Sequence, residues 1–210
     1  MLRNMKRAVR IRTGVNQDFT LLFGTETFTK LLEKWDTNFK LKIIKEAKSL
    51  TQTADLIDLL SSAEYNSDCW DSDMASLLLP VYLLPPPAGR KKSAKISASG
   101  AVDRSCCSLE EHLNRTKGQH QPFLLAVGTT RDKIHNFYIA VDKHLIPCQA
   151  SSSLGAFDEL FKAHFVFSLS YDEALSNVYT FLQTTVYHID VGSVKESPRV
   201  KELRARLLNC

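Results

Sequence analysis

The chain has 210 residues, of which 44% are hydrophobic and 24% charged, and its formal net charge is +4. These fractions are ordinary for a globular protein, and the length suits one large domain or two small ones. No apolar run approaches the roughly eighteen residues of a transmembrane helix, because Pro80 and Pro85 interrupt the longest one, and the N-terminus lacks a secretory signal. We therefore expect an intracellular protein, cytoplasmic or nuclear, without a membrane partner.

The basic residues gather in two stretches. Residues 1–13 contain five basic and no acidic residues, which predicts a basic arm, and residues 85–104 are rich in proline, small polar and basic residues, which is typical of a linker. We favour a solvated tail for the arm, because such tails are common. The alternative is contact with phosphate through Arg3, Lys6, Arg7, Arg10, Arg12, Arg90, Lys91 and Lys92.

Residues 14–84 read as a helical part. Apolar residues recur there every three or four positions, and Thr25, Thr53 and Asp71 are placed as N-caps. Pro80 should kink or end the last of these helices, since an interior proline costs about 3 kcal/mol. The predicted buried stripes are Phe28, Leu31, Leu32 and Trp35; Phe39, Ile43, Ile44 and Ala47; Leu56, Ile57, Leu60 and Ala63; and Met74, Leu77, Leu78 and Val81.

Residues 105–210 read as an α+β module. A capping box at 108–111 predicts a short helix, and three apolar segments at 123–127, 137–141 and 145–148 predict strands. The second segment alternates in period two, and short polar connections separate the three. We therefore predict a small antiparallel meander, which needs helices to cover it.

Three later helices are predicted to follow this meander. The first is capped by Ser153 and carries an apolar stripe that could cover one face of the sheet, and the second begins at a capping box in residues 170–173. The last starts at Ser197-Pro198. The fold class is thus α+β: an N-terminal helical part, then a meander covered by two or three helices. The predicted inward residues are Leu154, Phe157, Leu160, Phe161 and Phe165; Leu175, Val178, Tyr179, Leu182 and Val186; and Val200, Leu203 and Leu207.

A thiol nucleophile would require Cys148 beside a base. His144 lies four residues earlier, which in a strand places the two side chains about 13 Å apart, too far for a hydrogen bond. His164 could approach only through the fold. We favour Cys148 as a small buried apolar residue, so a Cys-His hydrolase is the least favoured alternative.

Metal and cofactor sites are not predicted. Cys106 and Cys107 are adjacent, whereas structural zinc sites separate paired cysteines by two to four residues, so this pair with His112 and His120 does not indicate zinc. No glycine-rich phosphate-binding loop is present in the sequence. The acidic pair Asp158-Glu159 is explained by capping in the first turn of a helix. We expect no catalytic, cofactor or metal-binding residues.

Several motifs together resemble one family. They are LFGTET at 22–27, WDSDM at 70–74, LLPP at 83–86, FLLAVG at 123–128, SLGAFDELFK at 153–162 and KESPRV at 195–200. With them the chain resembles the C-terminal half of fish proteins described as sterile alpha motif domain-containing protein 3-like. The resemblance spans 18–208 and lacks a counterpart of the sterile alpha motif itself. It implies family membership but little function, because no enzymatic activity is established for that region of those proteins.

The sequence therefore predicts a non-catalytic intracellular protein-interaction or regulatory module whose protein partner it does not identify. Binding could use apolar helix faces that the chain leaves uncovered. The first alternative is a nucleic-acid-associated protein that uses the basic arm and the linker.

Overall fold

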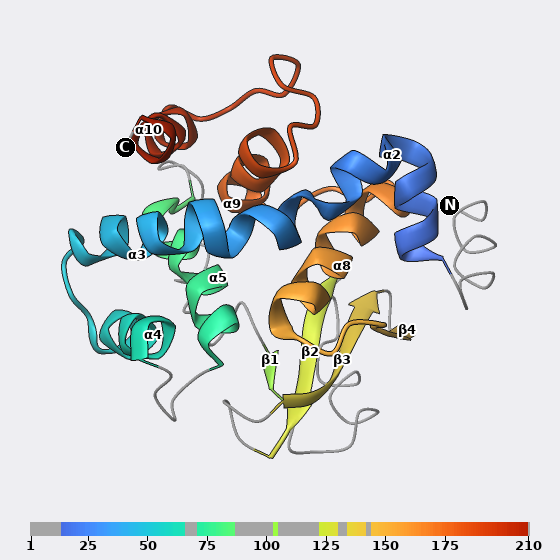
Figure 1. Ribbon diagram of the computed structural model, residues 1–210, viewed down its shortest axis with the longest axis horizontal. Helices are drawn as coiled ribbons and strands as arrows, with labels where there is room; N and C mark the ends of the chain where they lie inside the picture. The colour runs from blue at the N-terminus through green and yellow to red at the C-terminus, as the bar shows by residue number, and fades with distance from the viewer. Residues whose placement is uncertain are drawn as a thin grey trace.

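The structure is a computed structural model that describes residues 14–65, 71–86, 103–104, 122–129, 134–141 and 144–209. Helices precede and follow a small sheet, so the α+β class predicted from the sequence is confirmed (Figure 1). None of the helices in these ranges is long and apolar enough to cross a membrane. The elements of the N-terminal part are α2 (Val15–Lys34), the π-helical turn η1 (Trp35–Phe39), α3 (Lys40–Lys48), α4 (Ala54–Tyr65) and α5 (Ser72–Leu83).

Caps and breaks define these helices. The Thr53 hydroxyl accepts a hydrogen bond from the Leu56 amide at 3.3 Å, and the Asp71 carboxylate accepts one from the Met74 amide at 2.9 Å, which confirms both predicted caps. In contrast, α2 begins at Val15, well before the predicted Thr25, and is interrupted at Gly24, whose φ of 81° is not helical. The break explains why helical periodicity restarts near residue 25.

The prediction that Leu32 and Ile57 are buried is wrong. They are 42% and 49% exposed, so they lie at the edge of the buried stripe of their helices and not within it. Conversely, α5 is buried from Met74 to Pro80, beyond its predicted stripe, since α3, α4 and α8 all pack on it. The helix continues past Pro80 to Leu83, and so it does not end at the proline.

The sheet contains β1 (Asp103–Arg104), β2 (Phe123–Gly128), β3 (Ile134–Val141) and β4 (His144–Pro147) in that order. The last three form the predicted antiparallel meander, with Leu124 opposite Ile139 and Ile139 opposite Ile146. The two residues of β1 pair with β2 in parallel, so the end of the predicted linker joins the sheet. The predicted connection at 142–143 and the predicted helix at 108–111 lie outside the described residues.

The helices after the sheet are α8 (Ser153–Val166), α9 (Ser176–Phe181) with the π-helical turn η2 (Leu182–Val186), and α10 (Pro198–Leu208). Ser152, one residue before the predicted cap, accepts a hydrogen bond from the Gly155 amide. The predicted capping box at 170–173 does not start a helix: Asp172 accepts a bond from the Ala174 amide in a turn, and α9 begins only at Ser176.

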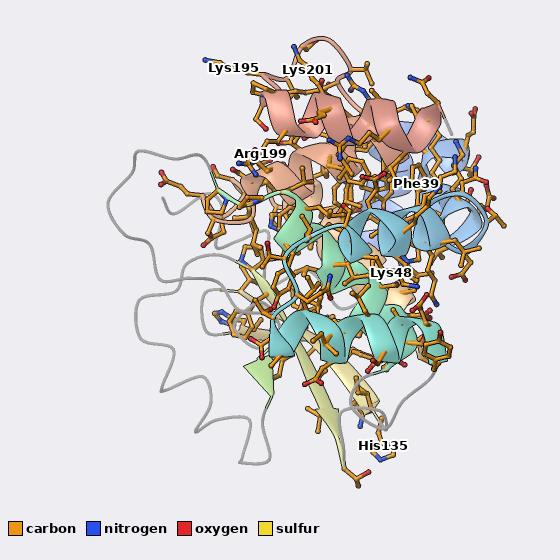
Figure 2. The ribbon with its side chains drawn as sticks, turned by 90° about the vertical axis from the view of Figure 1, so that its left-hand side faces the viewer. Phe39, Lys48, His135, Lys195, Arg199 and Lys201 are labelled. Carbon is orange, nitrogen blue, oxygen red and sulfur yellow. The ribbon has the colours of Figure 1, made fainter. Side chains whose placement is uncertain are left out.

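In α10 the sequence prediction is confirmed throughout. Ser197 caps the helix, Pro198 is its first residue, and Val200, Leu203 and Leu207 are buried. Figure 2 shows Lys195 and Lys201 at the outer edge of the molecule beside this helix. The charged side of α10 therefore faces solvent.

One hydrophobic core joins the N-terminal and C-terminal parts. It runs from Val15 in α2 to Leu207 in α10 and contains the inner face of β2 and β3. At its centre lies α8, which packs on β2 and β3 on one side and on α2 on the other (Figure 1). Nearly every residue of α8 from Ser153 to His164 is buried as a result.

Candidate functional site

The polar face of α8 is covered by α2. Asp158, Glu159 and Lys162 are only 2%, 6% and 0% exposed, although a charged helix face normally lies in solvent. The explanation of the two acids as first-turn caps is wrong, because α8 starts at Ser153 and places them in its second turn. Buried charged groups of this kind are found where they are paired, and where function requires them.

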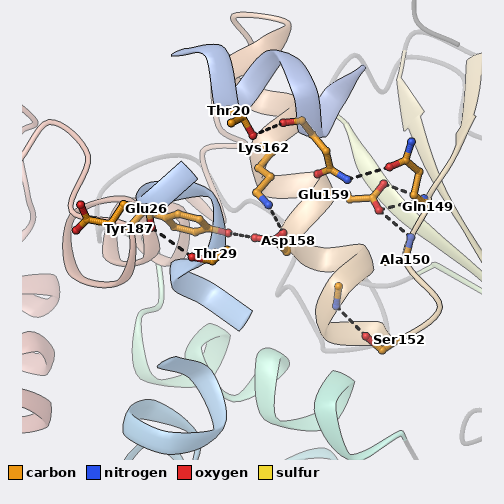
Figure 3. Close-up of polar contacts among 12 residues, drawn as sticks. Thr20, Glu26, Thr29, Gln149, Ala150, Ser152, Asp158, Glu159, Lys162 and Tyr187 are labelled. Carbon is orange, nitrogen blue, oxygen red and sulfur yellow. Dashed lines mark hydrogen bonds and ion pairs between the residues drawn. The ribbon is translucent and has the colours of Figure 1, made fainter. Parts of the chain in front are cut away.

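Asp158 is the centre of a buried ion pair. One carboxylate oxygen contacts the Lys162 ammonium, and the other accepts a hydrogen bond from the Tyr187 hydroxyl (Figure 3). The Lys162 ammonium also lies 3.4 Å from the centre of the Phe28 ring in α2, within range of a cation–π interaction. One charge pair therefore contacts three parts of the chain: α2, α8 and Tyr187, the residue after η2.

Burial shifts the pKa values of this group. It raises the pKa of Asp158 and lowers the pKa of Lys162, while their mutual attraction opposes both shifts. Burial also raises the pKa of Tyr187, which the adjacent Asp158 carboxylate raises further. Removing either charge would leave the other unpaired in the interior, so the geometry favours a structural role for the pair.

Glu159 fixes the segment between β4 and α8. Its carboxylate accepts hydrogen bonds from the backbone N–H groups of Gln149, at 3.0 Å, and Ala150, at 2.8 Å (Figure 3). The Gln149 side chain in turn accepts a bond from Asn16 in α2 at 3.3 Å. Charge-assisted bonds to backbone amides satisfy donors that the loop would otherwise leave open.

Aromatic rings surround the ion pair. The rings of Phe161 and Tyr187 stack at 4.1 Å between centroids, and Phe165 meets Phe23 edge-on at 5.2 Å and Phe19 at 5.9 Å. Such edge-to-face pairs contribute roughly 0.5–1.5 kcal/mol each beyond the area that they bury. The predicted phenylalanine stripe is therefore a core feature that contacts α2 as well as the sheet.

His164 is buried in a separate aromatic cluster. Its Nδ1 lies 3.0 Å from the Leu160 carbonyl oxygen, so this nitrogen carries a proton and donates, and its ring contacts Tyr171 and Tyr179. Burial lowers the pKa of His164 to about 4. The imidazole is neutral at pH 7 and is directed at tyrosine rings.

Cys148 lacks the features of an activated thiol. Its backbone amide continues the sheet by donating to the Phe137 carbonyl at 2.9 Å, and burial raises the pKa of its thiol to about 12, with Glu159 adding to the shift. A nucleophilic cysteine requires the opposite shift. His144 lies at the exposed start of β4.

One small hollow lies between α5, β2, α8 and α9. Its volume is about 40 Å³, and its lining is almost entirely apolar, with Leu77, Phe157 and Val178 among the residues. This space accommodates a small apolar group, whereas drug-sized ligands occupy about 300–1,000 Å³.

Most of the predicted candidate residues lie outside the described part of the chain. These are the cysteines and histidines of the rejected zinc site, Cys106, Cys107, His112 and His120, and all the possible phosphate contacts, Arg3, Lys6, Arg7, Arg10, Arg12, Arg90, Lys91 and Lys92. Within the described ranges no group of three or more His, Cys, Asp or Glu residues could hold a metal ion. Of the candidates that are described, the fold does not direct His164 at Cys148 but at tyrosine rings.

The ion pair of α8 was missed by the sequence reasoning. Asp158 and Lys162 have the i, i+4 spacing of a surface salt bridge, which conceals their burial. The sequence did contain one signal of this burial. Three phenylalanines lie close to Gly24, namely Phe19, Phe23 and Phe28, and so many large apolar rings need another surface to cover them.

Comparisons with family models, curated proteins and solved structures found no match for this chain.

Proposed function

We propose that the chain is a non-catalytic protein-interaction or regulatory module that acts inside the cell, in the cytoplasm or the nucleus. The observation that carries this proposal is the burial of three titratable groups of α8, Asp158, Lys162 and His164. The Asp158–Lys162 pair is sealed beneath Phe28, and His164 is packed against tyrosines. General acids, bases and nucleophiles must reach a substrate, and these groups do not.

The resemblance to sterile alpha motif domain-containing protein 3-like proteins supports the same proposal. It covers the part of those proteins that follows the sterile alpha motif, a region for which no enzymatic activity is established. The described surface also carries large apolar side chains, of which Leu21 and Leu22, adjacent in α2, are 79% and 59% exposed. Contiguous exposed apolar surface marks sites of protein contact, and these two leucines are a candidate for part of such a surface.

Capture of binding proteins on the immobilised chain tests this proposal directly. We expect captured protein to survive nuclease treatment and to be retained as salt rises, because the contacts are mainly apolar. Loss of the captured material on nuclease treatment, with a steep decrease in binding as salt rises, would instead support the nucleic-acid alternative through the basic arm and linker.

Alkylation of Cys148 tests the proposal that the chain is non-catalytic. We expect iodoacetamide to modify Cys148 more slowly at pH 7 than it modifies free cysteine, because burial raises the pKa of this thiol to about 12. Modification faster than free cysteine would support the Cys-His hydrolase alternative.

A further inference from the structure

The sheet formed by β2, β3 and β4 has two faces, and only one of them belongs to the core. Residues directly opposite each other in antiparallel strands lie on the same face of a sheet. On the first face Leu124, Ile139 and Ile146 lie opposite one another in turn, and all three are part of the core or pack against it. The other side, which we call the second face, carries Phe123, Leu125, Val127, Tyr138, Ala140 and Leu145.

The second face is apolar, although it lies outside the core. An antiparallel sheet with one face in water alternates apolar and polar residues, and β2, with the sequence FLLAVG, does not. None of the six residues of the second face is part of the core or packs against it.

Two residues of the second face are nevertheless completely buried. Leu125 and Ala140 are only 0% and 1% exposed. Side chains stand roughly perpendicular to a sheet, so neighbours in the strands do not by themselves enclose a leucine. A part of the chain other than the described helices of the core therefore covers this face.

The pairing of β1 indicates which part this is. Asp103 lies opposite Leu125 and Arg104 opposite Ala126, and the two strands are parallel. Neighbouring parallel strands cannot be joined by a hairpin: they need a crossover of about a dozen residues or more, usually with a helix, that passes over one face of the sheet. Residues 105–122 make this connection and are long enough for it. Because α8 packs on the first face, the connection has to cross the second face.

The sequence of this connection suits an apolar surface. The capping box at 108–111 predicts the start of a helix, and Leu109 and Leu113, four residues apart, lie on one side of it. The basic arm, residues 1–13, and the linker, residues 85–104, are rich in lysine and arginine instead. Covering an apolar face with these residues would take charges out of water, which is unfavourable.

We propose that residues 105–121 dock on the second face of the sheet through Leu109 and Leu113, which cover Leu125 and Ala140. The segment then completes a crossover unit with β1 and β2, and the sheet is enclosed between it and α8. This inference goes beyond the proposed function and holds whether or not the chain binds a protein. It assigns an occupant from the same chain to an apolar surface that the described helices leave open, so a protein partner has to bind elsewhere.

Photo-crosslinking in the full chain identifies the occupant. Tyr138, half-buried on the second face, is replaced by p-benzoylphenylalanine, and the irradiated chain is digested and analysed by mass spectrometry. We expect cross-links to residues 105–121. The same replacement of His135, at an exposed position of β3, is the control and should give no cross-link to that segment.

Alkylation of a thiol on the second face tests the contact of Leu113. Ala140→Cys adds this thiol, and mass spectrometry of peptides distinguishes it from the native cysteines. Combined with Leu113→Asp, it should react with iodoacetamide at least about tenfold faster than alone, because burial of a leucine side chain is worth more than this factor. Combined with Asn114→Asp, which adds the same charge on another side of the predicted helix, it should react at an unchanged rate.

Cross-links from position 138 to residues 1–13 or 85–104 would overturn the proposal, because another segment would then be the occupant. Cross-links to a second copy of the chain alone would overturn it in favour of a dimer interface, and the absence of any cross-link would also overturn it. Equal alkylation rates with Leu113→Asp and Asn114→Asp would contradict the contact of Leu113. If circular dichroism shows that the Leu113→Asp chain is unfolded, the cross-linking result decides.

Discussion

The helices α8 and α10 have similar sequence patterns and opposite surroundings. Each has an apolar stripe and a charged side, yet the charged side of α10 faces solvent while that of α8 is covered by α2. In α10, Lys201 is exposed; in α8, Lys162 is fully buried. The comparison shows that an amphipathic pattern identifies the face that contacts the core but does not establish that the other face contacts water.

The largest effect should come from replacing Lys162. Lys162→Met leaves Asp158 buried without its cation, and loss of one partner from a buried pair lowers the free energy of unfolding by about 3–5 kcal/mol. Lys201→Met on the exposed side of α10 is the matched control and should change it by no more than about 0.5 kcal/mol. Urea unfolding measures both.

The double variant Asp158→Asn/Lys162→Met sharpens this test. Removing both charges together avoids the unpaired ion, so most of the lost stability should return. Equal effects of Lys162→Met and Lys201→Met would show that the buried side of α8 is no different from the exposed side of α10.

The next largest effect should be a loss of stability in acid caused by His164. The pKa of His164 is about 4 in the folded chain and 6.5 ordinarily, so between these values the unfolded chain binds the proton and the folded chain does not. The free energy of unfolding should therefore fall as pH decreases from 6.5 to 4, by about 3 kcal/mol in total.

The control for this pH dependence is a histidine in a different setting. His164→Phe, which keeps a ring beside Tyr171 and Tyr179, should remove this part of the pH dependence, and His135→Phe at an exposed position of β3 should leave it. Unfolding in urea across the pH range is the measurement. An unchanged slope in His164→Phe would contradict the assignment.

The comparison of α8 with α10 also shows which features the sequence could predict. The three strands, the caps Thr53, Asp71 and Ser197, and the buried face of α10 depend on local periodicity and turn chemistry, and their predictions are confirmed. The packing of α2 on α8 joins residues more than a hundred positions apart, as in the contact between the rings of Phe19 and Phe165. Local patterns contain no information on which helix covers a charged face.

A smaller effect should follow from Tyr187→Phe. The substitution removes the hydroxyl that donates to Asp158 and keeps the ring stacked on Phe161, so the free energy of unfolding should fall by about 1–3 kcal/mol. Tyr65→Phe, at a side chain that is 77% exposed, is the matched control and should have almost no effect. Equal stability of the two variants would remove Tyr187 from the buried network.

The smallest effect should follow from Ser197→Ala at the start of α10. Loss of its hydrogen bond to the Val200 amide should lower the free energy of unfolding by about 1 kcal/mol. Ser152→Ala, the same change at the start of α8, should cost a similar amount. If Ser197→Ala lowered stability more than Lys162→Met does, the account would be contradicted, because it expects the buried charge of α8 to matter more than a cap of α10.

The central claim is that both faces of α8 are buried, and native-state hydrogen exchange tests it most directly. Helices covered on all sides open only with the whole protein, whereas surface helices open locally. We expect the amides of α8 to exchange with the free energy of global unfolding, and those of α10 to exchange faster. Exchange of α8 at the same rate as α10, or faster, would contradict the buried position of its charged face.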